Sequence, residues 1–302
     1  MAEPPLARVN HAPIAAASLI FATNHCNSNC VMCPDTEFSR RRSSSITLSS
    51  LLEKTMYFPP DTPHITITGG EPTLMGYDLI RLLALCRSRF NRTDFLLLSN
   101  GRAFADAQFT KAFAENSPCG IVVGIPLYAG EPGAHDSITQ TNGSFAQAVE
   151  GAARLIAIGA AVEIRVVVMR QNYKDLPNIA RFICGAFPSA SRVHLMGLEM
   201  TGSAYRNRES VWVGFDDTAP YIKAAASLLI SAGIYCQLYN FPLCHTVKQL
   251  WSLCAKSITP SKVRYASECV ACAAHDQCGG FFASTLAVMK PAARPIREVN
   301  HV

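Results

Sequence analysis

The sequence has no apolar run of the roughly 20 residues that a membrane-spanning helix needs. It also lacks a complete export signal. The segment Pro13 to Ala22 is apolar and alanine-rich, but it contains a proline, and only Arg8 supplies positive charge before it. We therefore expect no membrane association, a buried strand in place of a signal peptide, and a cytoplasmic location.

Blocks of a single charge are equally scarce. The net charge is +5, and the 27 basic residues are scattered apart from Arg40, Arg41 and Arg42. We interpret that triplet as a solvated loop, with docking of an acidic peptide or a nucleic acid there as the alternative. The sequence as a whole predicts no nucleic-acid partner.

No internal repeat and no low-complexity tract interrupts the 302 residues, which excludes repeat arrays and disordered chains. A chain of this length can bury an ordinary core without disulfides. Cysteine, in contrast, is abundant, with 12 residues. Because clustered cysteines in a reducing compartment bind metal more often than they pair, their spacing is the main functional signal.

Short apolar segments alternate with helical segments along most of the chain. Strands are predicted at residues 18–23, 65–68, 95–98, 121–127, 162–169 and 192–198. Helices are predicted at residues 47–57, 79–89, 105–114, 145–158, 176–187 and 221–231. This alternation requires βαβ units, so the predicted fold class is α/β with a parallel sheet.

Polar residues break the apolar pattern at the ends of four of these strands. Cys26 to Cys33 follows the first strand, Gly69 to Pro72 the second, Ser99 and Asn100 the third, and Glu199 the sixth. The loops after the strands of a parallel barrel share one face, where active sites collect. Four separate segments are therefore expected to meet at one pocket.

The loop N-H-C-N-S-N-C-V-M-C-P at 24–34 carries Cys26, Cys30 and Cys33 with the spacing C-x3-C-x2-C. Three thiolates can hold three irons of a [4Fe-4S] cluster, which leaves the fourth iron open. A ferredoxin-like or zinc-binding loop is the competing interpretation, because C-x2-C followed by proline also occurs in electron-transfer sites.

The second predicted strand ends at Gly69, Gly70, Glu71 and Pro72. Glycines at this position let a ligand approach the backbone closely, and the proline fixes the turn. A simple strand-to-helix turn with a solvated glutamate is the alternative.

In this order, the cysteine loop and the G-G-E-P turn resemble the radical SAM superfamily, whose open iron binds the amino and carboxylate groups of S-adenosylmethionine (SAM). The resemblance implies a partial (β/α)6 TIM-like barrel. It assigns Gly69 to Pro72 to the SAM amino group. It assigns Ser99 and Asn100 to the ribose hydroxyls, where a polar turn is the alternative.

Two further residues are candidates for SAM contacts through the same resemblance. Arg165, within V-E-I-R-V-V-V, points either outward to solvent or inward, where its guanidinium could pair with the SAM carboxylate. Glu199, in M-G-L-E-M, is similarly placed after a strand. Helix capping or a salt bridge is the alternative role for Glu199.

A second group of cysteines lies near the C-terminus. Cys269, Cys272 and Cys278 are spaced C-x2-C-x5-C, and Cys244 and Cys254 precede them. Four thiolates can bind a structural zinc ion or a fully ligated [4Fe-4S] cluster. The region resembles SPASM and twitch domains, which implies an auxiliary [4Fe-4S] cluster with Cys244 as the preferred fourth ligand and Cys254 in reserve. Four other cysteines are expected to be buried small hydrophobes: Cys86, Cys119, Cys184 and Cys236.

Further phrases narrow the resemblance: G-I-P-L-Y at 124–128, H-D-S-I-T at 135–139, M-G-L-E-M-T-G at 196–202, Y-N-F-P-L-C at 239–244 and C-G-G-F-F at 278–282. With the two cysteine sets, they resemble the His-Xaa-Ser system radical SAM maturase family, in its C-type member, over about residues 18–284. S-I-T-P-S-K at 257–262 departs from that family's phrase. The implied organisation is an N-terminal extension at 1–17, a barrel at 18–215 and a small cysteine-rich auxiliary-cluster domain at 216–302.

The family resemblance implies an oxidoreductase that cleaves SAM to a 5′-deoxyadenosyl radical, which takes a hydrogen atom from a ribosomally made precursor peptide. The implied partners are that peptide, a second radical SAM protein and a low-potential reductant such as flavodoxin or ferredoxin. We expect no peptide-binding domain before the barrel, and therefore expect leader recognition by another chain or by the barrel rim. The alternatives are a radical SAM enzyme acting on a small molecule in cofactor biosynthesis and a non-catalytic iron-sulfur electron-transfer subunit.

Overall fold

The computed structural model describes residues 18–35 and 46–298. The predicted N-terminal extension at 1–17 and the triplet Arg40, Arg41 and Arg42 lie outside the described residues.

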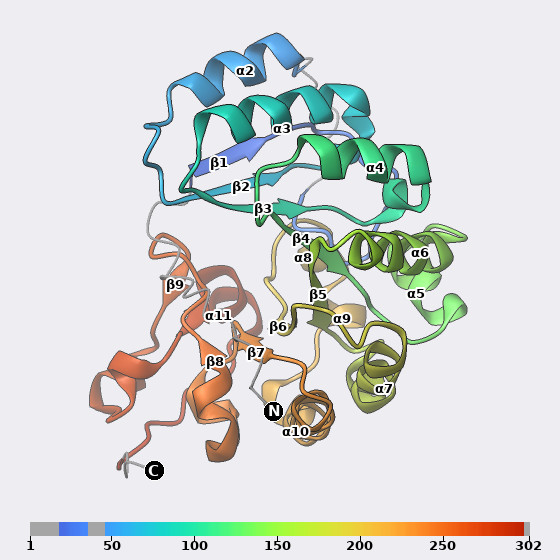
Figure 1. Ribbon diagram of the computed structural model, residues 1–302. Helices are drawn as coiled ribbons and strands as arrows, with labels where there is room; N and C mark the ends of the chain where they lie inside the picture. The colour runs from blue at the N-terminus through green and yellow to red at the C-terminus, as the bar shows by residue number, and fades with distance from the viewer. Residues whose placement is uncertain (1–17, 36–45, 299–302) are drawn as a thin grey trace, which may run out of the picture.

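Eight parallel strands form one sheet in which each strand pairs with its neighbours in the sequence (Figure 1). They are β1 (Ser18–Phe21), β2 (His64–Thr68), β3 (Asp94–Leu98), β4 (Val122–Pro126), β5 (Ala161–Val168), β6 (Arg192–Gly197), β7 (Cys236–Tyr239) and β8 (Cys254–Ala255). This order confirms the predicted α/β class and is that of a partial parallel barrel. With β7 and β8, the sheet is two strands longer than the six that the sequence predicts.

Helices connect the strands and cover the outer side of the sheet. The α-helices are α2 (Leu48–Met56), α3 (Tyr77–Arg89), α4 (Ala107–Asn116), α5 (Pro132–Thr139), α6 (Ser144–Ala157), α7 (Leu176–Ala186), α8 (Gly202–Arg206), α9 (Arg208–Val211), α10 (Phe215–Ser231) and α11 (Ala283–Met289). Figure 1 shows α2, α3 and α4 beside β1 to β3, and α5, α6, α7 and α10 along the rest of the sheet.

Strand β5 shows how the sequence separates the two sides of the sheet. Its residues Val162, Ile164, Val166 and Val168 are buried in the main hydrophobic core. Because side chains alternate along a strand, Glu163, Arg165 and Val167 share the opposite, inner face. The core therefore lies between sheet and helices, and charged residues remain for the barrel interior.

The C-terminal region follows β7, contains β8, and lies beside the β7 end of the sheet, in orange and red in Figure 1. It contains an antiparallel pair of two-residue strands, β9 (Val263–Arg264) and β10 (Phe281–Phe282). Short 3₁₀ helices carry much of the rest: η4 (Leu243–His245), η5 (Lys248–Leu253), η6 (Ser267–Ala271) and η7 (His275–Gln277). The predicted domain boundary at 215 stays a prediction.

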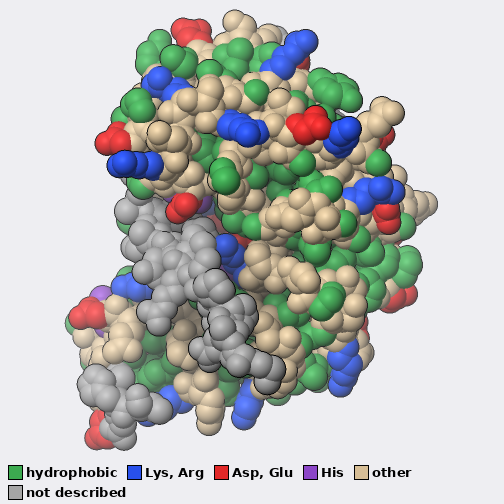
Figure 2. All heavy atoms as spheres, in the orientation of Figure 1, with side chains coloured by type: hydrophobic (Ala, Val, Ile, Leu, Met, Phe, Trp, Pro, Cys, Tyr) green, Lys and Arg blue, Asp and Glu red, His purple; other side chains and the backbone are tan. Residues whose placement is uncertain are grey.

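The surface drawn in Figure 2 carries acidic and basic side chains interspersed with one another. This is the pattern of an ordinary solvated face rather than of a basic stripe. Within residues 18–35 and 46–298, no helix combines the length and the apolar character that crossing a bilayer requires.

Candidate functional site

A cavity of about 370 Å³ opens at the carboxyl ends of the parallel strands. The residues predicted from sequence that line it are Cys26, Cys30, Cys33, Gly69, Gly70, Glu71, Ser99, Asn100, Arg165 and Glu199. Pro72 is buried at the start of the 3₁₀ helix η1 (Pro72–Met75), outside that lining. The expected meeting of four separate segments at one pocket is therefore what the fold produces.

The backbone of the cysteine loop is hydrogen-bonded to helices that follow it in the sequence. The backbone N–H groups of Asn29 and Val31 donate to the carbonyls of Thr139 and Ile138, at 3.0 and 2.9 Å, at the end of α5. Ser203 N–H donates to the Cys33 carbonyl at 2.8 Å. These contacts give the three thiols one fixed backbone.

The glycines after β2 are required by the chain's own backbone. Gly70 N–H donates to the Thr23 carbonyl at 2.6 Å, and Glu71 N–H donates to the His25 carbonyl at 2.7 Å. A Cβ on Gly70 would lie 2.2 Å from the His25 oxygen, and one on Gly69 would lie 2.4 Å from the Thr23 oxygen. The sequence predicts that a ligand approaches these glycines closely. In the structure, it is the backbone of the cysteine loop that lies against them.

Glu71 is buried, so the alternative of a solvated glutamate is wrong. Its carboxylate accepts hydrogen bonds from the backbone and hydroxyl of Thr73, from the Ser99 hydroxyl at 2.8 Å and from Asn100 N–H at 2.6 Å. Burial raises the pKa of Glu71, while these hydrogen bonds lower it in part. Glu71 therefore joins the ends of β2 and β3 and fixes both predicted ribose-contacting residues.

Arg165 has the inward orientation, with a largely buried side chain that reaches the cavity. Beneath it, Glu163 ion-pairs with Arg165, lies 3.1 Å from His194 Nδ1 and is 3.8 Å from Arg192. The His194 ring stacks on Tyr239, with 4.1 Å between centroids. Burial alone would raise the pKa of Glu163, but the adjacent His194 ring and the charges of Arg165, His194 and Arg192 hold that pKa at about 2.

The C-terminal region supplies part of the cavity wall. Glu199, from the segment after β6, forms an ion pair with Lys262 at 3.0 Å, so the salt-bridge alternative is observed. Phe282 and Asn240 also line the cavity. The barrel and the C-terminal region thus share one pocket.

Two residues of the cavity region were not identified from the sequence. Tyr128, just after β4, lines the cavity, and its pKa is raised well above the usual value by burial and by the nearby thiols of Cys30, Cys33 and Cys26. Arg102, which follows β3, donates to the carbonyl of Asn27 in the cysteine loop at 2.5 Å. Both residues follow the end of a strand, and this position is the sequence feature that could have identified them as site residues.

A second, much smaller cavity of about 10 Å³ is lined by Cys244, Cys269, Cys272 and Cys278. Cys254 is outside this lining, and its thiol donates to the Leu250 carbonyl at 3.6 Å. Backbone N–H groups point at the cysteine sulfurs. Leu243 and Gly280 each donate to Cys278 Sγ at 3.4 Å, and Ile296 donates to Cys272 Sγ at 3.3 Å.

The other cysteines divide into two groups. Cys86 and Cys236 are buried, as expected, and Cys184 is partly buried. Cys119 is exposed, so its expected burial is wrong, because it lies in the turn that follows α4. In the described part of the chain, no three His, Cys, Asp or Glu side chains form a group placed to hold a metal ion.

The described cysteines are thus not arranged as ready-made metal-ion sites, but their numbers in the two cavities correspond to the two kinds of iron-sulfur site. Three cysteines line the first cavity together with an inward arginine, which fits a [4Fe-4S] cluster that keeps one iron for a second ligand. Four cysteines line the second cavity, and two of them, Cys272 and Cys278, accept backbone N–H groups, so the number of thiols is that of a fully ligated cluster.

Comparison with known proteins identifies the N-terminal part of the chain. The profile of the Radical SAM superfamily matches residues 20–183. None of the curated proteins compared matches the chain. Native anSMEcpe with bound AdoMet and Kp18Cys peptide is similar in structure, with a TM-score of 0.58 and 17% identity over 73% of this chain and 63% of that one.

A radical SAM methyltransferase from Sphaerobacter thermophilus is also similar, with a TM-score of 0.52 and 13% identity over 74% of this chain and 65% of that one. The chain therefore spans less than two thirds of the length of either protein. At such identities, the likeness concerns the fold.

Proposed function

The chain belongs to the radical SAM superfamily, and from this premise we propose that it is an oxidoreductase that modifies a ribosomally made peptide. The observation that carries the proposal is the meeting of three thiols, the G-G-E-P turn and an inward arginine in one cavity. The three cysteines would hold a [4Fe-4S] cluster there, which with SAM would supply a 5′-deoxyadenosyl radical for removal of a hydrogen atom from a substrate carbon.

Cys26, Cys30 and Cys33 hold the cluster. Gly70 and Glu71 already donate their N–H groups to the cysteine loop, which leaves the carbonyl oxygens of the turn to accept from the SAM amino group. Ser99 and Asn100, fixed by Glu71, contact the ribose hydroxyls.

Arg165 pairs with the SAM carboxylate. Its guanidinium is held from beneath by Glu163, so the orientation of the fork is set before SAM arrives. Glu199 lies at the same cavity from the C-terminal side, next to Lys262. We assign it to the far end of SAM or to the substrate-facing rim.

The cavity wall protects a reactive intermediate from competing hydrogen donors. Met196, Val167, Leu98 and Phe282 present apolar surface between the polar groups. Such a wall excludes water and leaves the positioned substrate carbon as the available donor.

Cys244, Cys269, Cys272 and Cys278 would hold an auxiliary [4Fe-4S] cluster at the second cavity. Its complete set of thiols suits electron transfer, because a fully ligated cluster keeps no open iron for a substrate. Such a cluster would supply an acceptor for the surplus electron that formation of the product bond leaves.

A peptide substrate is supported by the structural likeness to anSMEcpe, which is described with a bound peptide. The resemblance to the His-Xaa-Ser maturases supports a precursor with repeated His-Xaa-Ser. The proposal includes a second radical SAM protein or peptide-recognition chain, a flavodoxin or ferredoxin reductant, and the reducing cytoplasm as location.

The test is anaerobic reconstitution followed by iron counting and a SAM-cleavage assay. About eight irons per chain are expected for two clusters, and about four for one cluster plus zinc. The triple variant C26A/C30A/C33A should lose deoxyadenosine formation, whereas C119A, at the exposed cysteine, should retain it. Deoxyadenosine from the triple variant would contradict the assignment of the first site.

Substrate class is tested separately. A precursor peptide with His-Xaa-Ser repeats, encoded by a gene next to that of this protein, is incubated with enzyme, SAM and reductant and then analysed by mass spectrometry. A decrease in the mass of the peptide that corresponds to the loss of hydrogen atoms supports the proposal. SAM cleavage without any change in the peptide favours the small-molecule alternative, and absence of cleavage with both clusters intact favours an electron-transfer subunit.

A further inference from the structure

The chain crosses the second cavity once more after its last cysteine. Arg294, Pro295 and Ile296 line that cavity together with the four cysteines. The backbone N–H of Ile296 donates to Cys272 Sγ at 3.3 Å. We call residues 292–296 the cover segment.

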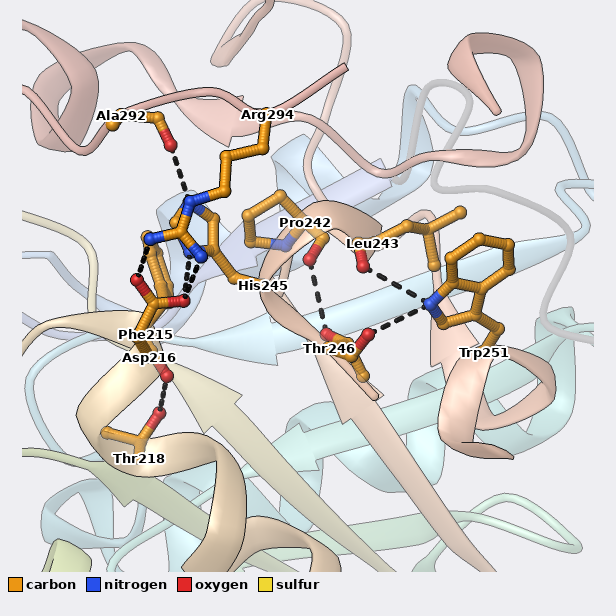
Figure 3. Close-up of polar contacts among 10 residues, drawn as sticks. All are labelled: Phe215, Asp216, Thr218, Pro242, Leu243, His245, Thr246, Trp251, Ala292 and Arg294. Carbon is orange, nitrogen blue, oxygen red and sulfur yellow. Dashed lines mark hydrogen bonds and ion pairs between the residues drawn. The ribbon is translucent and has the colours of Figure 1, made fainter. Parts of the chain in front are cut away.

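The cover segment is fastened to the barrel by an ion pair that Figure 3 shows. The Arg294 guanidinium makes two hydrogen bonds to the Asp216 carboxylate, at 3.1 and 2.5 Å. Asp216 belongs to the first turn of α10, far from the cover segment in sequence. A bidentate pair of this kind fixes orientation as well as distance.

His245, the residue that follows Cys244, also contacts Asp216 and the cover segment. Its Nδ1 lies 2.9 Å from Asp216 Oδ1, and its Nε2 donates to the Ala292 carbonyl at 2.8 Å (Figure 3). The ring is buried against Phe215 and Phe281. One carboxylate therefore holds both the cover segment and the turn that carries Cys244.

That turn has a further restraint on its other side. The Trp251 indole N–H donates to the carbonyls of Leu243 and Thr246, at 3.2 and 3.0 Å (Figure 3). The position of the Cys244 backbone is thus set independently of the cover segment. Two other hydrogen bonds, from His245 to the Ala292 carbonyl and from Ala273 N–H to the Ile296 carbonyl, also hold the cover segment. Removal of Arg294 should therefore loosen the cover segment without detaching it and without unfolding the turn.

We propose that the cover segment is part of the second metal site, with Asp216 and Arg294 as the positioning residues that keep it closed. It shields Cys244 and Cys272 from solvent and directs the backbone N–H of Ile296 at the Cys272 sulfur. Such a donor stabilises the reduced, more negative state of an iron-sulfur cluster and so raises its reduction potential. The effect on potential rests on the proposed function, whereas the shielding of the thiols does not.

Shielding is tested on the purified full-length chain before reconstitution, by alkylation with iodoacetamide and peptide mapping. The variant R294Q should speed modification of Cys244 and Cys272 by about fivefold, the size expected for loss of a partly exposed bidentate pair. R297Q, which changes an exposed arginine of the same tail, should leave the rates unchanged, and R294K should fall between.

The hydrogen bond is tested after reconstitution in the C26A/C30A/C33A background, where the second cluster alone gives a signal. I296P removes the N–H that points at Cys272, whereas I296V keeps it. I296P should shift the midpoint potential of the cluster to a more negative value, measured by redox titration with electron paramagnetic resonance. I296V should have the same midpoint potential as the C26A/C30A/C33A variant in which it is made.

The outcomes separate this inference from the proposed function. About eight irons per chain with alkylation unchanged in R294Q would overturn the cover segment and leave the proposed function standing. About four irons with faster alkylation would support the shielding and overturn the second cluster. An unchanged potential in I296P would overturn the role of the Ile296 N–H.

Discussion

The Glu71 carboxylate accepts a hydrogen bond from the backbone N–H of Asn100 at 2.6 Å, and this bond joins the ends of two neighbouring strands. The same carboxylate accepts from Ser99 and Thr73. Every one of these partners is a donor, so only an acceptor side chain satisfies the position. Glu71 is thus the fixed point about which the cavity wall after β2 and β3 is arranged.

Replacement of Glu71 by Gln should destabilise the protein. The amide would turn an N–H₂ group toward buried donors and leave at least one of them unsatisfied, at a cost of about 1 to 3 kcal/mol. Urea denaturation of the E71Q variant measures the loss, and SAM binding by calorimetry should weaken in parallel. E115Q, at an exposed glutamate of α4, serves as the control and should show neither effect.

Gly70→Ala should displace the cysteine loop. A Cβ at this position would lie 2.2 Å from the His25 carbonyl oxygen, so the backbone of the loop has to move. We expect a loss of about 2 kcal/mol or more in the free energy of unfolding and a lower iron content after reconstitution.

The control for this substitution is Gly185→Ala in α7, where an added Cβ meets nothing within 4 Å. Because alanine favours a helix over glycine, this variant should gain about 0.5 to 1 kcal/mol. If G70A binds iron as well as G185A does, the packing of the cysteine loop against Gly70 is not what positions the thiols.

Glu163 should make stability depend on pH in the acid range. Its pKa is about 2 in the folded protein against the ordinary value of 4.5, so its stabilising contribution is complete above pH 4.5 and is lost as pH falls toward 2. The contribution is on the order of 3 kcal/mol at neutral pH.

The measurement compares wild type with E163Q by urea denaturation at neutral pH and at about pH 3. The difference in the free energy of unfolding should shrink by roughly half at the lower pH, because Glu163 then ionises only in the folded state. E53Q, at an exposed glutamate of α2, should show a small difference that stays constant. A constant difference for E163Q as well would mean that the carboxylate is not held ionised by its neighbours.

Cys244 and Cys254 should differ sharply when each is replaced by alanine. C244A removes a thiol that lines the second cavity and should lower iron from about eight to about four per chain. C254A removes a thiol outside that lining and should keep both clusters. Iron analysis and the cluster absorption spectrum give the answer, and equal iron loss in both variants would contradict the assignment of Cys244.

The fold was largely predictable because its signals are local. β-branched runs such as 162–168 and helices with apolar residues three and four apart determine strands and helices within a few residues. Helix α5 was missed, because it is short and begins with Pro132 and Gly133, which are poor helix formers in general. A Glu131 side chain that caps the Ala134 N–H compensates for this weakness.

The parts of the candidate site that consist of short motifs with a fixed residue spacing were predictable from the sequence. The parts that depend on contacts between residues far apart in the sequence were not. The cysteines and the G-G-E-P turn are readable as motifs. Lys262 beside Glu199 and the fastening of the cover segment by Asp216 are contacts between segments remote in sequence, which periodicity cannot reveal. Cys119 was misjudged because its apolar character was weighed above the P-C-G turn that contains it.

The strands lie side by side in the order in which a ribosome makes them. Synthesis delivers about 5 to 20 residues per second, and N-terminal units fold first. The trio of thiols near the beginning of the chain can therefore be enclosed by its parallel neighbours while Cys269, Cys272 and Cys278 are still unmade. In a nascent polypeptide built this way, the two sets of sulfur ligands are synthesised at different times, and the first set emerges together with the strands that surround it.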